Sequence, residues 1–300
     1  MSNLYWPIYK NLEKEVVELS NWVHFDDKQL FVYSVKISEL LIRCSVEIES
    51  ISKDLYLENG GVLPEEGDLY FDTDCLKFLD EKWKLSKKVV VPSSSNFHFE
   101  NESNKLLTPL HKSFKRGSSG ADWKKAYQAV KHERVKSLSK GNLGNLLRAL
   151  AALFILNLYY KKEIFSLGKD SSGNTFSESC GSDIFSVLVH KRAGHDGNGN
   201  YIKKEEFDQS IYYVNWTNET GLEFQKSVSG MNQRVSQLFL QHPKILEYIS
   251  QNDASNYQGN LAWDVLGQDE YIRILQQAQR DVPLKSEQLE YEARVNLQDV

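Results

Sequence analysis

The stretch NLLRALAALFILNLYY, residues 145–160, decides the fold class of this chain. Its second half is apolar on nearly every side, and a helix of that kind is stable only when other elements surround it. The longest apolar run, Ala149 to Tyr160, contains Asn157 and falls short of the roughly 20 residues that a membrane-spanning helix needs. We therefore predict a buried core helix from about Asn142 to Lys162, and no association with a membrane.

Two amphipathic helices are predicted upstream of this core helix. From Leu30 to Leu55 apolar residues recur at steps of three and four over about seven turns, which is the period of a helix with one buried face. The long helix is expected to end at Asn59 and Gly60, which tolerate the left-handed backbone that closes many helices. A shorter helix precedes it from Ile8 to Leu19, and one of the two aspartates Asp26 and Asp27 is suited to cap the longer helix.

Four segments have β character. KVVVP, residues 88–92, and FHF, residues 97–99, flank the turn-rich SSSN and predict a small hairpin. IFSVLVHK, residues 184–191, and SIYYVNW, residues 210–216, are rich in β-branched and aromatic residues and predict a second hairpin across GHDGNGN. The sequence therefore indicates a mainly α protein, a helical bundle with a minor β-hairpin element.

The domain organisation follows from a change of composition after the core helix. Residues 166–183 are polar, rich in serine and glycine and without periodicity, which is typical of a surface loop or a domain boundary. We therefore predict a helical domain over 1–165 and a mixed, appended C-terminal region over 184–300. In that region MNQRVSQLFLQ, PKILEYIS and DEYIRILQQAQR have helical spacing, and the charged tail from Pro283 has few apolar residues and is expected at the periphery.

Composition limits the classes of function. A net charge of −5 argues against a chain that coats nucleic acid or an anionic membrane along its whole length, although a local basic surface is possible. The three cysteines show neither CxxC nor Cys/His ligand spacing, so neither a disulfide framework nor a zinc site is indicated, and a reducing cytosol is the expected compartment. The first residues lack the basic and apolar regions of a secretory signal, which also favours a cytoplasmic location.

Positive charge gathers in one part of the chain. Residues 111–140 contain nine lysines and arginines against two acids. Such a run is either a solvated helix face or an anion-binding surface, because clustered cations release the counterions of phosphates and hold the backbone of a nucleic acid. The segment SSGAD offers Ser119 as an N-cap, with Asp122 three residues on, for a helix through WKKAYQAVKHER, residues 123–134.

Helical geometry divides this basic helix into two faces. Trp123, Tyr127 and Val130 form one stripe, which we expect to face inward. Lys124, Gln128 and His132 lie on another face.

The end of the basic helix leaves two alternatives. Arg134 returns to the inward stripe if the helix continues, so either it forms an interior ion pair or the helix bends near Glu133. His132 has Lys125, Gln128 and Lys136 as neighbours and is the candidate general base. The alternative is an inert surface histidine.

A family resemblance is carried by DWKKAYQAVKHERV, residues 122–135, followed by NLGNLLRALAALFILNLYY, residues 142–160. Together they resemble bacterial HEPN-like helical proteins, in particular a group with the pattern W…YN…KH.R before a long apolar helix. ISELLIRCSVEIESI, residues 37–51, then corresponds to the earlier core helix of that family. The resemblance covers about residues 28–57 and 115–163 and says nothing of the rest.

The resemblance implies an RNA-directed protein, possible forms being a metal-independent endoribonuclease of phage defence or of a toxin–antitoxin system, without a cofactor. It also implies a homodimer and an antitoxin or defence-system partner. Aligned on the histidine, His132 takes the place of the family's histidine, Gln128 that of its asparagine and Tyr127 that of its arginine. The family's arginine is therefore missing at that place, and Arg134 is the candidate substitute. The cations expected on RNA phosphates are Lys124, Lys125, Lys131 and Lys136.

The sequence also allows two other interpretations. Without the arginine, the chain is alternatively a non-catalytic helical scaffold or partner-binding protein. DGNGNYIKKEEF, residues 196–207, resembles a calcium loop, but Tyr201 stands where glycine belongs and Phe207 where the bidentate acid belongs, so we expect a turn and no calcium site at 196–206. His190 and His195 lack a third ligand, and no metal site is expected there.

Overall fold

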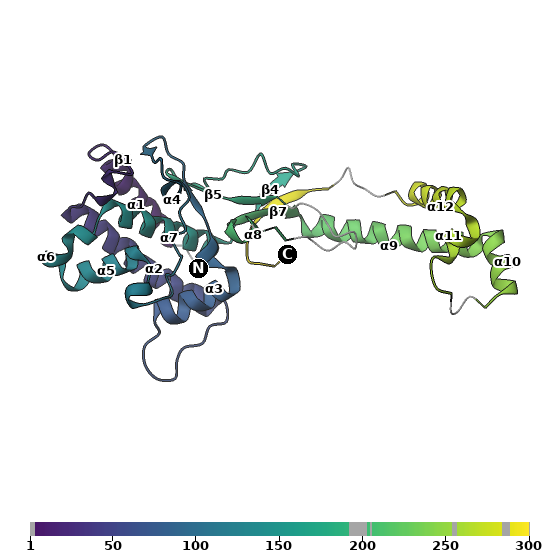
Figure 1. The fold of residues 1–300 in the computed structure, drawn as a ribbon, viewed down its shortest axis with the longest axis horizontal. Coiled ribbons are helices and arrows are strands. Elements are labelled where there is room, and N and C mark those ends of the chain that lie inside the picture. Colours follow the sequence, from purple (N-terminus) through teal and green to yellow (C-terminus); the bar gives the residue numbers. More distant parts are fainter. Residues whose placement is uncertain (1–3, 192–202, 205, 254–256, 284–288, 300) are drawn as a thin grey trace. The chain divides into compact units, whose positions relative to one another are not determined.

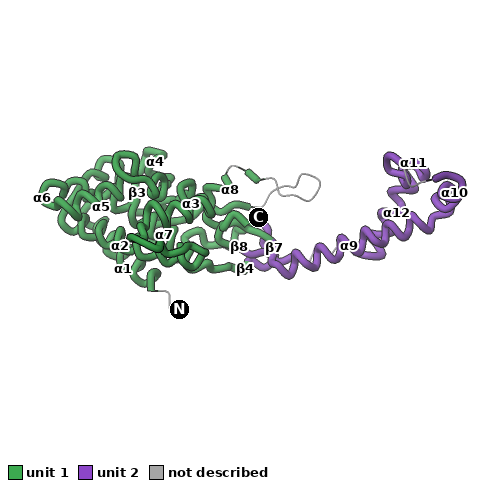
Figure 2. Tube along the Cα trace, turned by 90° about the horizontal axis from the view of Figure 1, so that it is seen from below, with its two compact units in different colours: residues 1–166, 172–215, 293–300 green, residues 167–171, 216–292 purple. Residues whose placement is uncertain are grey.

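The computed structural model describes residues 4–191, 203–204, 206–253, 257–283 and 289–299 (Figure 1). The chain divides into two compact units, which Figure 2 colours separately. Unit 1 consists of residues 1–166, 172–215 and 293–300, and unit 2 of residues 167–171 and 216–292. Within the described residues the chain forms twelve α-helices and a smaller amount of sheet, so the predicted mainly α class is confirmed.

The core of unit 1 is built around helix α7, Leu143–Lys161. Helices α1, Tyr5–Leu19, α2, Val35–Glu58, and α5, Asp122–His132, all pack against it (Figure 1). Every side chain of α7 from residue 149 to residue 159 is buried, because this half has no polar face to turn toward water. This is the one described helix long and apolar enough to cross a membrane, but 83% of its apolar window is buried inside the protein, as the predicted core helix requires.

The ends of the long helix α2 are set by side chains near in sequence. Ser34 is its N-cap and accepts a hydrogen bond from the backbone N–H of Ile37 at 3.1 Å. Asn59 is its C-cap, and Gly60 adopts the predicted left-handed backbone, with φ of 95°. The predicted aspartate cap is wrong, because Asp26 instead accepts from the N–H groups of Lys28 and Gln29 and so begins the 3₁₀ turn η1, Gln29–Phe31.

Short helical turns connect the long helices of unit 1. The segment after α2 contains a π-helical turn, η2, Phe71–Leu76, which continues into α3, Lys77–Trp83. Lys84 adopts a left-handed conformation, with φ of 56°, and ends α3. The remaining turns are η3, Leu85–Lys87, α4, Glu102–Lys105, η4, Gly117–Ser119, α6, Arg134–Ser137, η5, Leu138–Lys140, and α8, Glu206–Gln209.

The first predicted hairpin is wrong, although both of its strands form. Strand β2, Val90–Pro92, pairs antiparallel with β5, Phe185–Val187. Strand β3, Phe97–His98, pairs parallel with β1, Phe25–Asp26. The aromatic ring of Phe97 lies 5.6 Å from that of Phe25 and 6.4 Å from that of Phe185, between centroids. Burial against distant aromatic residues therefore outweighs the local turn signal.

The second predicted hairpin is also wrong. Four strands form a sheet in the order β4, Phe165–Gly168, β8, Tyr291–Val295, β7, Tyr212–Trp216, and β6, Val189–Lys191. Strands β6 and β7 are parallel, and a hairpin requires antiparallel strands. A crossover connection is needed, and the predicted turn lies within residues 192–202, outside the described part of the chain.

The C-terminal tail is not peripheral, contrary to the prediction. Strand β8 lies between β4 and β7, with Ala293 fully buried. Asn296 is also fully buried, and its amide nitrogen donates to the carbonyl oxygens of Phe207 at 2.6 Å and Ser210 at 3.1 Å. The hydroxyl of Tyr159 donates to the carbonyl oxygen of Asn296 at 2.8 Å. Few apolar residues are enough here because backbone pairing and buried hydrogen bonds hold the segment.

The units divide the chain differently from the predicted ranges. The polar segment 166–183 does contain a boundary, since residues 167–171 belong to unit 2 and the chain returns to unit 1 at residue 172. Residues 184–215 and 293–300, however, belong to unit 1 and not to a separate C-terminal region. The segment suspected as a calcium loop, 196–206, and His195 lie outside the described residues, apart from 203–204 and Glu206.

Unit 2 is helical, and its predicted helices are confirmed. It contains α9, Asn218–Gln241, α10, Pro243–Gln251, α11, Leu261–Leu266, and α12, Gln268–Asp281. Helices α9 and α12 pack together, and Arg234 forms a 2.8 Å ion pair with Asp281 between them. Ile245, Leu266 and Ile274 form a buried hydrophobic cluster in this unit.

Candidate functional site

Helix α5 carries the predicted site residues on a strongly two-sided surface. Trp123, Tyr127 and Val130 are at most 1% exposed, so the predicted inward stripe is confirmed. The indole N–H of Trp123 donates to the carbonyl oxygen of Pro109 at 2.8 Å, which ties the start of the helix to the preceding loop. The predicted N-cap is wrong, because the helix begins at Asp122 and the hydroxyl of Ser119 donates to the carbonyl oxygen of Arg116.

The helix ends where one of the two predicted alternatives placed a bend. His132 is its last residue, and Glu133 leaves the helical conformation with φ of −136° and ψ of 56°. Arg134 begins the short helix α6 and is exposed, so it does not form an interior ion pair. His132 is exposed as well. The imidazole is thus open to solvent at the end of α5 and next to a chain bend.

Lys124 does not lie on the exposed surface predicted to bind phosphates. Its side chain is 6% exposed, and its ammonium donates to Asp72 Oδ2 at 3.0 Å and to the carbonyl oxygen of Ser113 at 2.7 Å. It also donates to the carbonyl oxygen of Lys115. Burial lowers the pKa of Lys124, while the carboxylate of Asp72 opposes this shift. Lys124 is a structural cation that holds the loop before α5.

Asp72 is the centre of a buried ionic cluster. The guanidinium of Arg116 binds both of its carboxylate oxygens, with Nε at 3.1 Å and 3.0 Å and Nη2 at 2.8 Å. The backbone N–H of Thr73 donates to the same carboxylate at 2.8 Å. Burial alone would raise the pKa of Asp72, but the hydrogen bonds from Arg116 and Lys124 lower it to about 2. Asp72 is therefore ionised at neutral pH, and the cluster has a fixed geometry.

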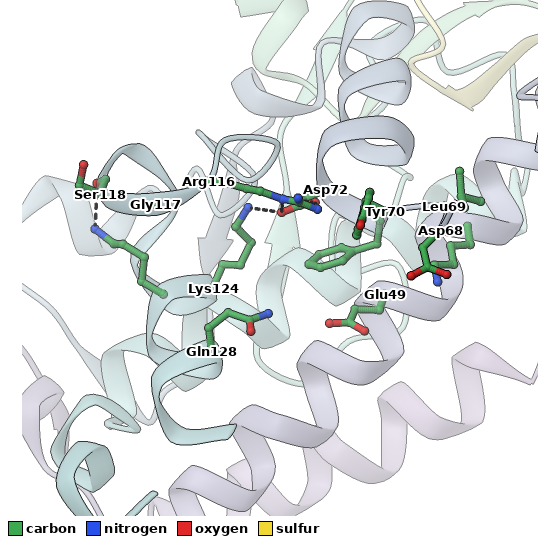
Figure 3. Close-up of a pocket in the computed structure, with 13 residues that line it drawn as sticks. Glu49, Asp68, Leu69, Tyr70, Asp72, Arg116, Gly117, Ser118, Lys124 and Gln128 are labelled. Atoms are coloured by element: carbon green, nitrogen blue, oxygen red, sulfur yellow. Dashed lines mark hydrogen bonds and ion pairs between the residues drawn. The ribbon is translucent and has the colours of Figure 1, made fainter. Parts of the chain in front are cut away.

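A pocket of about 770 Å³ opens beside this cluster (Figure 3). Helix α2 supplies one wall, the segment that leads into the π-helical turn η2 supplies the second, and turn η4 with helix α5 supplies the third. Its volume lies in the range of small-molecule sites. The lining residues are Glu49, Lys53, Asp68, Leu69, Tyr70, Phe71, Asp72, Arg116, Gly117, Ser118, Lys124, Lys125 and Gln128.

Three of the predicted site residues line this pocket, and two others, Tyr127 and Lys131, bond to each other on the same helix. Lys124, Lys125 and Gln128 lie on the α5 side of the pocket. Lys131 donates to the hydroxyl of Tyr127 at 3.1 Å. Burial raises the pKa of Tyr127, and the bond to its hydroxyl raises the pKa of Lys131, so both remain protonated at neutral pH.

Most of the cations in residues 111–140 are exposed. Lys124 is buried, and the other eight lysines and arginines are exposed. Among the described residues, only Arg116, Lys124 and Lys125 of the nine are within ion-pair distance of a carboxylate. The other six have no such carboxylate in the described part of the chain, and these are Lys112, Lys115, Lys131, Arg134, Lys136 and Lys140.

The walls of the pocket opposite α5 could not be predicted from the sequence. Asp72 and Tyr70 lie in a mixed segment without periodicity, and no spacing links Asp72 to Arg116, 44 residues later. Glu49 sits on the flank of the α2 pattern, where an acid looks like an ordinary solvated residue. Only the charge surplus of residues 111–140 pointed to this part of the molecule.

No arrangement for a metal appears in the described part of the chain, where no group of three or more histidine, cysteine, aspartate or glutamate side chains could hold an ion. A flat organic ligand is the class that the pocket could hold, because Tyr70 and the Arg116 guanidinium offer planar surfaces. Comparison of the chain with protein-family models, with curated proteins and with solved structures gives no match.

Proposed function

We propose that this chain is a HEPN-like RNA-directed protein that holds single-stranded RNA on the exposed cations of residues 111–140. The observation that carries the proposal is the segregation of charge: eight exposed cations in one short stretch, six of them without a carboxylate partner among the described residues, in a chain whose net charge is −5. An unpaired surface cation gains most from a phosphate, because binding releases counterions from the nucleic acid.

The catalytic form of this proposal is a metal-independent endoribonuclease with His132 as general base. The imidazole would take the proton of a ribose 2′-hydroxyl, the 2′-oxygen would form a bond to the adjacent phosphorus, and the bond from phosphorus to the 5′-oxygen would break. The leaving 5′-oxygen would take back a proton, giving a 2′,3′-cyclic phosphate and a 5′-hydroxyl end. Exposure of His132 at the end of α5, next to Lys131 and Arg134, supports this assignment.

A non-catalytic scaffold is the second candidate, and two observations favour it. Tyr127, which stands in the family's arginine place, is 1% exposed and cannot contact a substrate phosphate with its ring. Unit 2 exposes large apolar side chains that a partner protein could cover. They include Leu222, Leu240, Leu246, Ile249 and Trp263, which are 41–61% exposed.

RNA binding is tested by fluorescence anisotropy with a labelled oligouridine over a series of salt concentrations. Binding should weaken as salt rises, with a slope in the logarithmic plot of about −0.7 for each phosphate contacted. The double variant Lys131→Ala/Lys136→Ala should bind more weakly and show a shallower slope. Lys14→Ala/Lys77→Ala removes two exposed charges elsewhere in unit 1 and is the matched control. Salt-independent binding, or equal losses in both variants, would contradict the proposal.

Cleavage is tested separately, with chelator present and no added metal. Wild type should release fragments with 2′,3′-cyclic phosphate ends, and His132→Ala should not. Equal activity in the two proteins, or activity in neither, removes the ribonuclease and leaves RNA binding or the scaffold. The homodimer and the antitoxin or defence-system partner remain predictions, and sedimentation of the purified chain tests the first of them.

A further inference from the structure

The pocket beside Asp72 has surfaces that fit a flat ring. Tyr70 is 48% exposed, and the guanidinium of Arg116 lies 4.3 Å from the centroid of its ring. Asp72 holds that guanidinium in place by three hydrogen bonds, so the guanidinium and the Tyr70 ring lie together before any ligand arrives. Aromatic side chains and arginine planes are the surfaces on which single-stranded bases stack. The pocket therefore offers a preformed stacking platform.

Side chains outside the ionic cluster are placed to form hydrogen bonds with the polar edge of a ligand. Arg116 and Lys124 share the single carboxylate of Asp72, so both side chains are held in place and the three groups together keep one net positive charge. Gln128 is half-buried, and its amide makes no hydrogen bond to another described residue. Glu49 is half-buried on α2, and Figure 3 shows the side chains of Glu49 and Gln128 pointing toward one another across the pocket. In that view both side chains lie on the side away from Tyr70 and Arg116, so one edge of a ring stacked on the platform can meet the carboxylate and the amide together.

This pair of groups selects among the four bases. A carboxylate accepts two hydrogen bonds side by side, and an amide nitrogen donates one. On its Watson–Crick edge guanine presents, in order, the O6 acceptor, the N1–H donor and the 2-amino donor. Adenine and cytosine each offer one donor next to an acceptor, and uracil offers one donor between two acceptors. Only guanine gives Glu49 two donors while leaving an acceptor for Gln128.

We propose that this pocket binds the guanine base of a nucleotide, with Glu49 on the N1–H and 2-amino group and Gln128 on O6. The base stacks on the Tyr70 and Arg116 platform. Lys125 is exposed at the rim, where its contacts are an ion pair with the exposed Asp122 and a 3.5 Å hydrogen bond to the carbonyl oxygen of Ser118, and such weak surface contacts can be exchanged for the nucleotide's phosphate. The volume of about 770 Å³ accommodates a whole nucleotide. Free guanine nucleotides and guanine within RNA share this chemistry, and the second source rests on the function proposed above.

The test is calorimetric titration of the full chain with guanosine, inosine and adenosine monophosphates. Wild type should bind guanosine monophosphate at least tenfold more tightly than the adenosine compound. Inosine monophosphate lacks the 2-amino group and should lose most of that advantage without any change to the protein. Glu49→Gln turns one acceptor into a donor and should reduce the preference to threefold or less, while binding of adenosine monophosphate stays the same. Glu39→Gln changes an exposed glutamate of the same helix outside the pocket and should keep the full preference.

Equal affinity for the three nucleotides, no binding of guanosine monophosphate at millimolar concentration, or a full preference in Glu49→Gln each overturns the inference. Oligouridine contains no guanine, so its binding reports on the basic surface alone. If oligouridine binds with salt dependence and guanosine monophosphate does not, the pocket assignment fails and the RNA proposal stands. If guanosine monophosphate binds and no RNA does, the inference stands with the free nucleotide as its ligand.

Discussion

Replacement of Asp72 by asparagine should destabilise unit 1 more than any other neutral change on the pocket wall. Asp72 is 5% exposed and is the shared counterion of two cations, the buried ammonium of Lys124 and the guanidinium of Arg116. Asparagine has nearly the same size, so packing is preserved and the loss is electrostatic. It leaves Lys124 charged and buried without a counterion, which is the costly way to break an ion pair.

The size of this loss of stability depends on the interactions that Lys124 and Arg116 keep after the substitution. Breaking a buried pair from one side costs about 3–5 kcal/mol. Lys124 keeps two backbone carbonyl acceptors, on Ser113 and Lys115, and the side chain of Arg116 is 50% exposed, so water takes over part of its solvation. We therefore expect a loss at the lower end, about 3 kcal/mol at pH 7.

Urea denaturation followed by circular dichroism measures this loss as a shift of the midpoint at constant slope. Asp68→Asn changes an exposed carboxylate on the same pocket and should stay within about 0.5 kcal/mol of wild type. Adding Lys124→Met to Asp72→Asn should recover at least about 1 kcal/mol, because the uncompensated charge is removed. A loss under 1 kcal/mol in Asp72→Asn, equal to that of Asp68→Asn, would refute the reasoning.

The pH dependence gives an independent check with a defined sign. The pKa of Asp72 is lowered from 3.8 to about 2 in the folded protein. Its contribution to stability is therefore complete above the pKa of the unfolded chain and is lost as the pH falls through the folded value. The difference between wild type and Asp72→Asn should be constant above about pH 5 and shrink as the pH falls toward 2.

Two further predictions concern buried groups outside the pocket. Burial lowers the pKa of Lys88 from 10.5 to about 7, so between pH 7 and 9 the unfolded chain binds a proton that the folded protein lacks. The free energy of unfolding of wild type, measured relative to that of Lys88→Met, should therefore rise over this pH range. A difference that stays constant between pH 7 and 9 contradicts the assignment. Burial raises the pKa of all three cysteine thiols to about 12. The native protein should therefore react slowly with a thiol reagent at pH 8, whereas the urea-unfolded chain should react rapidly at three sites. Fast labelling of the native protein would contradict this prediction.

The helices could be predicted because their signals are local. The apolar spacing of α2 repeats over the length of the helix, and the all-round apolarity of α7 is visible in one window of sequence. The inward stripe of α5 followed from the same geometry, and the bend near Glu133 was one of the two alternatives that this geometry left open. Each of these patterns indicates which face of a helix is buried, whichever element of the fold covers that face.

The strand partners could not be predicted, because their pairing is decided by distant burial. Val90 pairs with Val187 and Phe25 with Phe97, whereas the local signals favoured hairpins between near neighbours. Pairing with distant strands also explains the C-terminal tail. Its charged sequence predicts a peripheral segment, but strand β8 lies inside a sheet. A β-strand's stability depends on its neighbours more than on its own residues.

The amino-acid sequence by itself determined the mainly helical fold, the central position of α7 and the surplus of positive charge between residues 111 and 140. Only the tertiary structure decided which of those cations remain available. It brings Asp72 from another segment onto Arg116 and Lys124, and it sets Glu49 opposite Gln128 across a pocket. The physical reason is that helical periodicity is written over a few turns of chain, whereas compensation of a charge depends on what the fold places within a few ångströms of it.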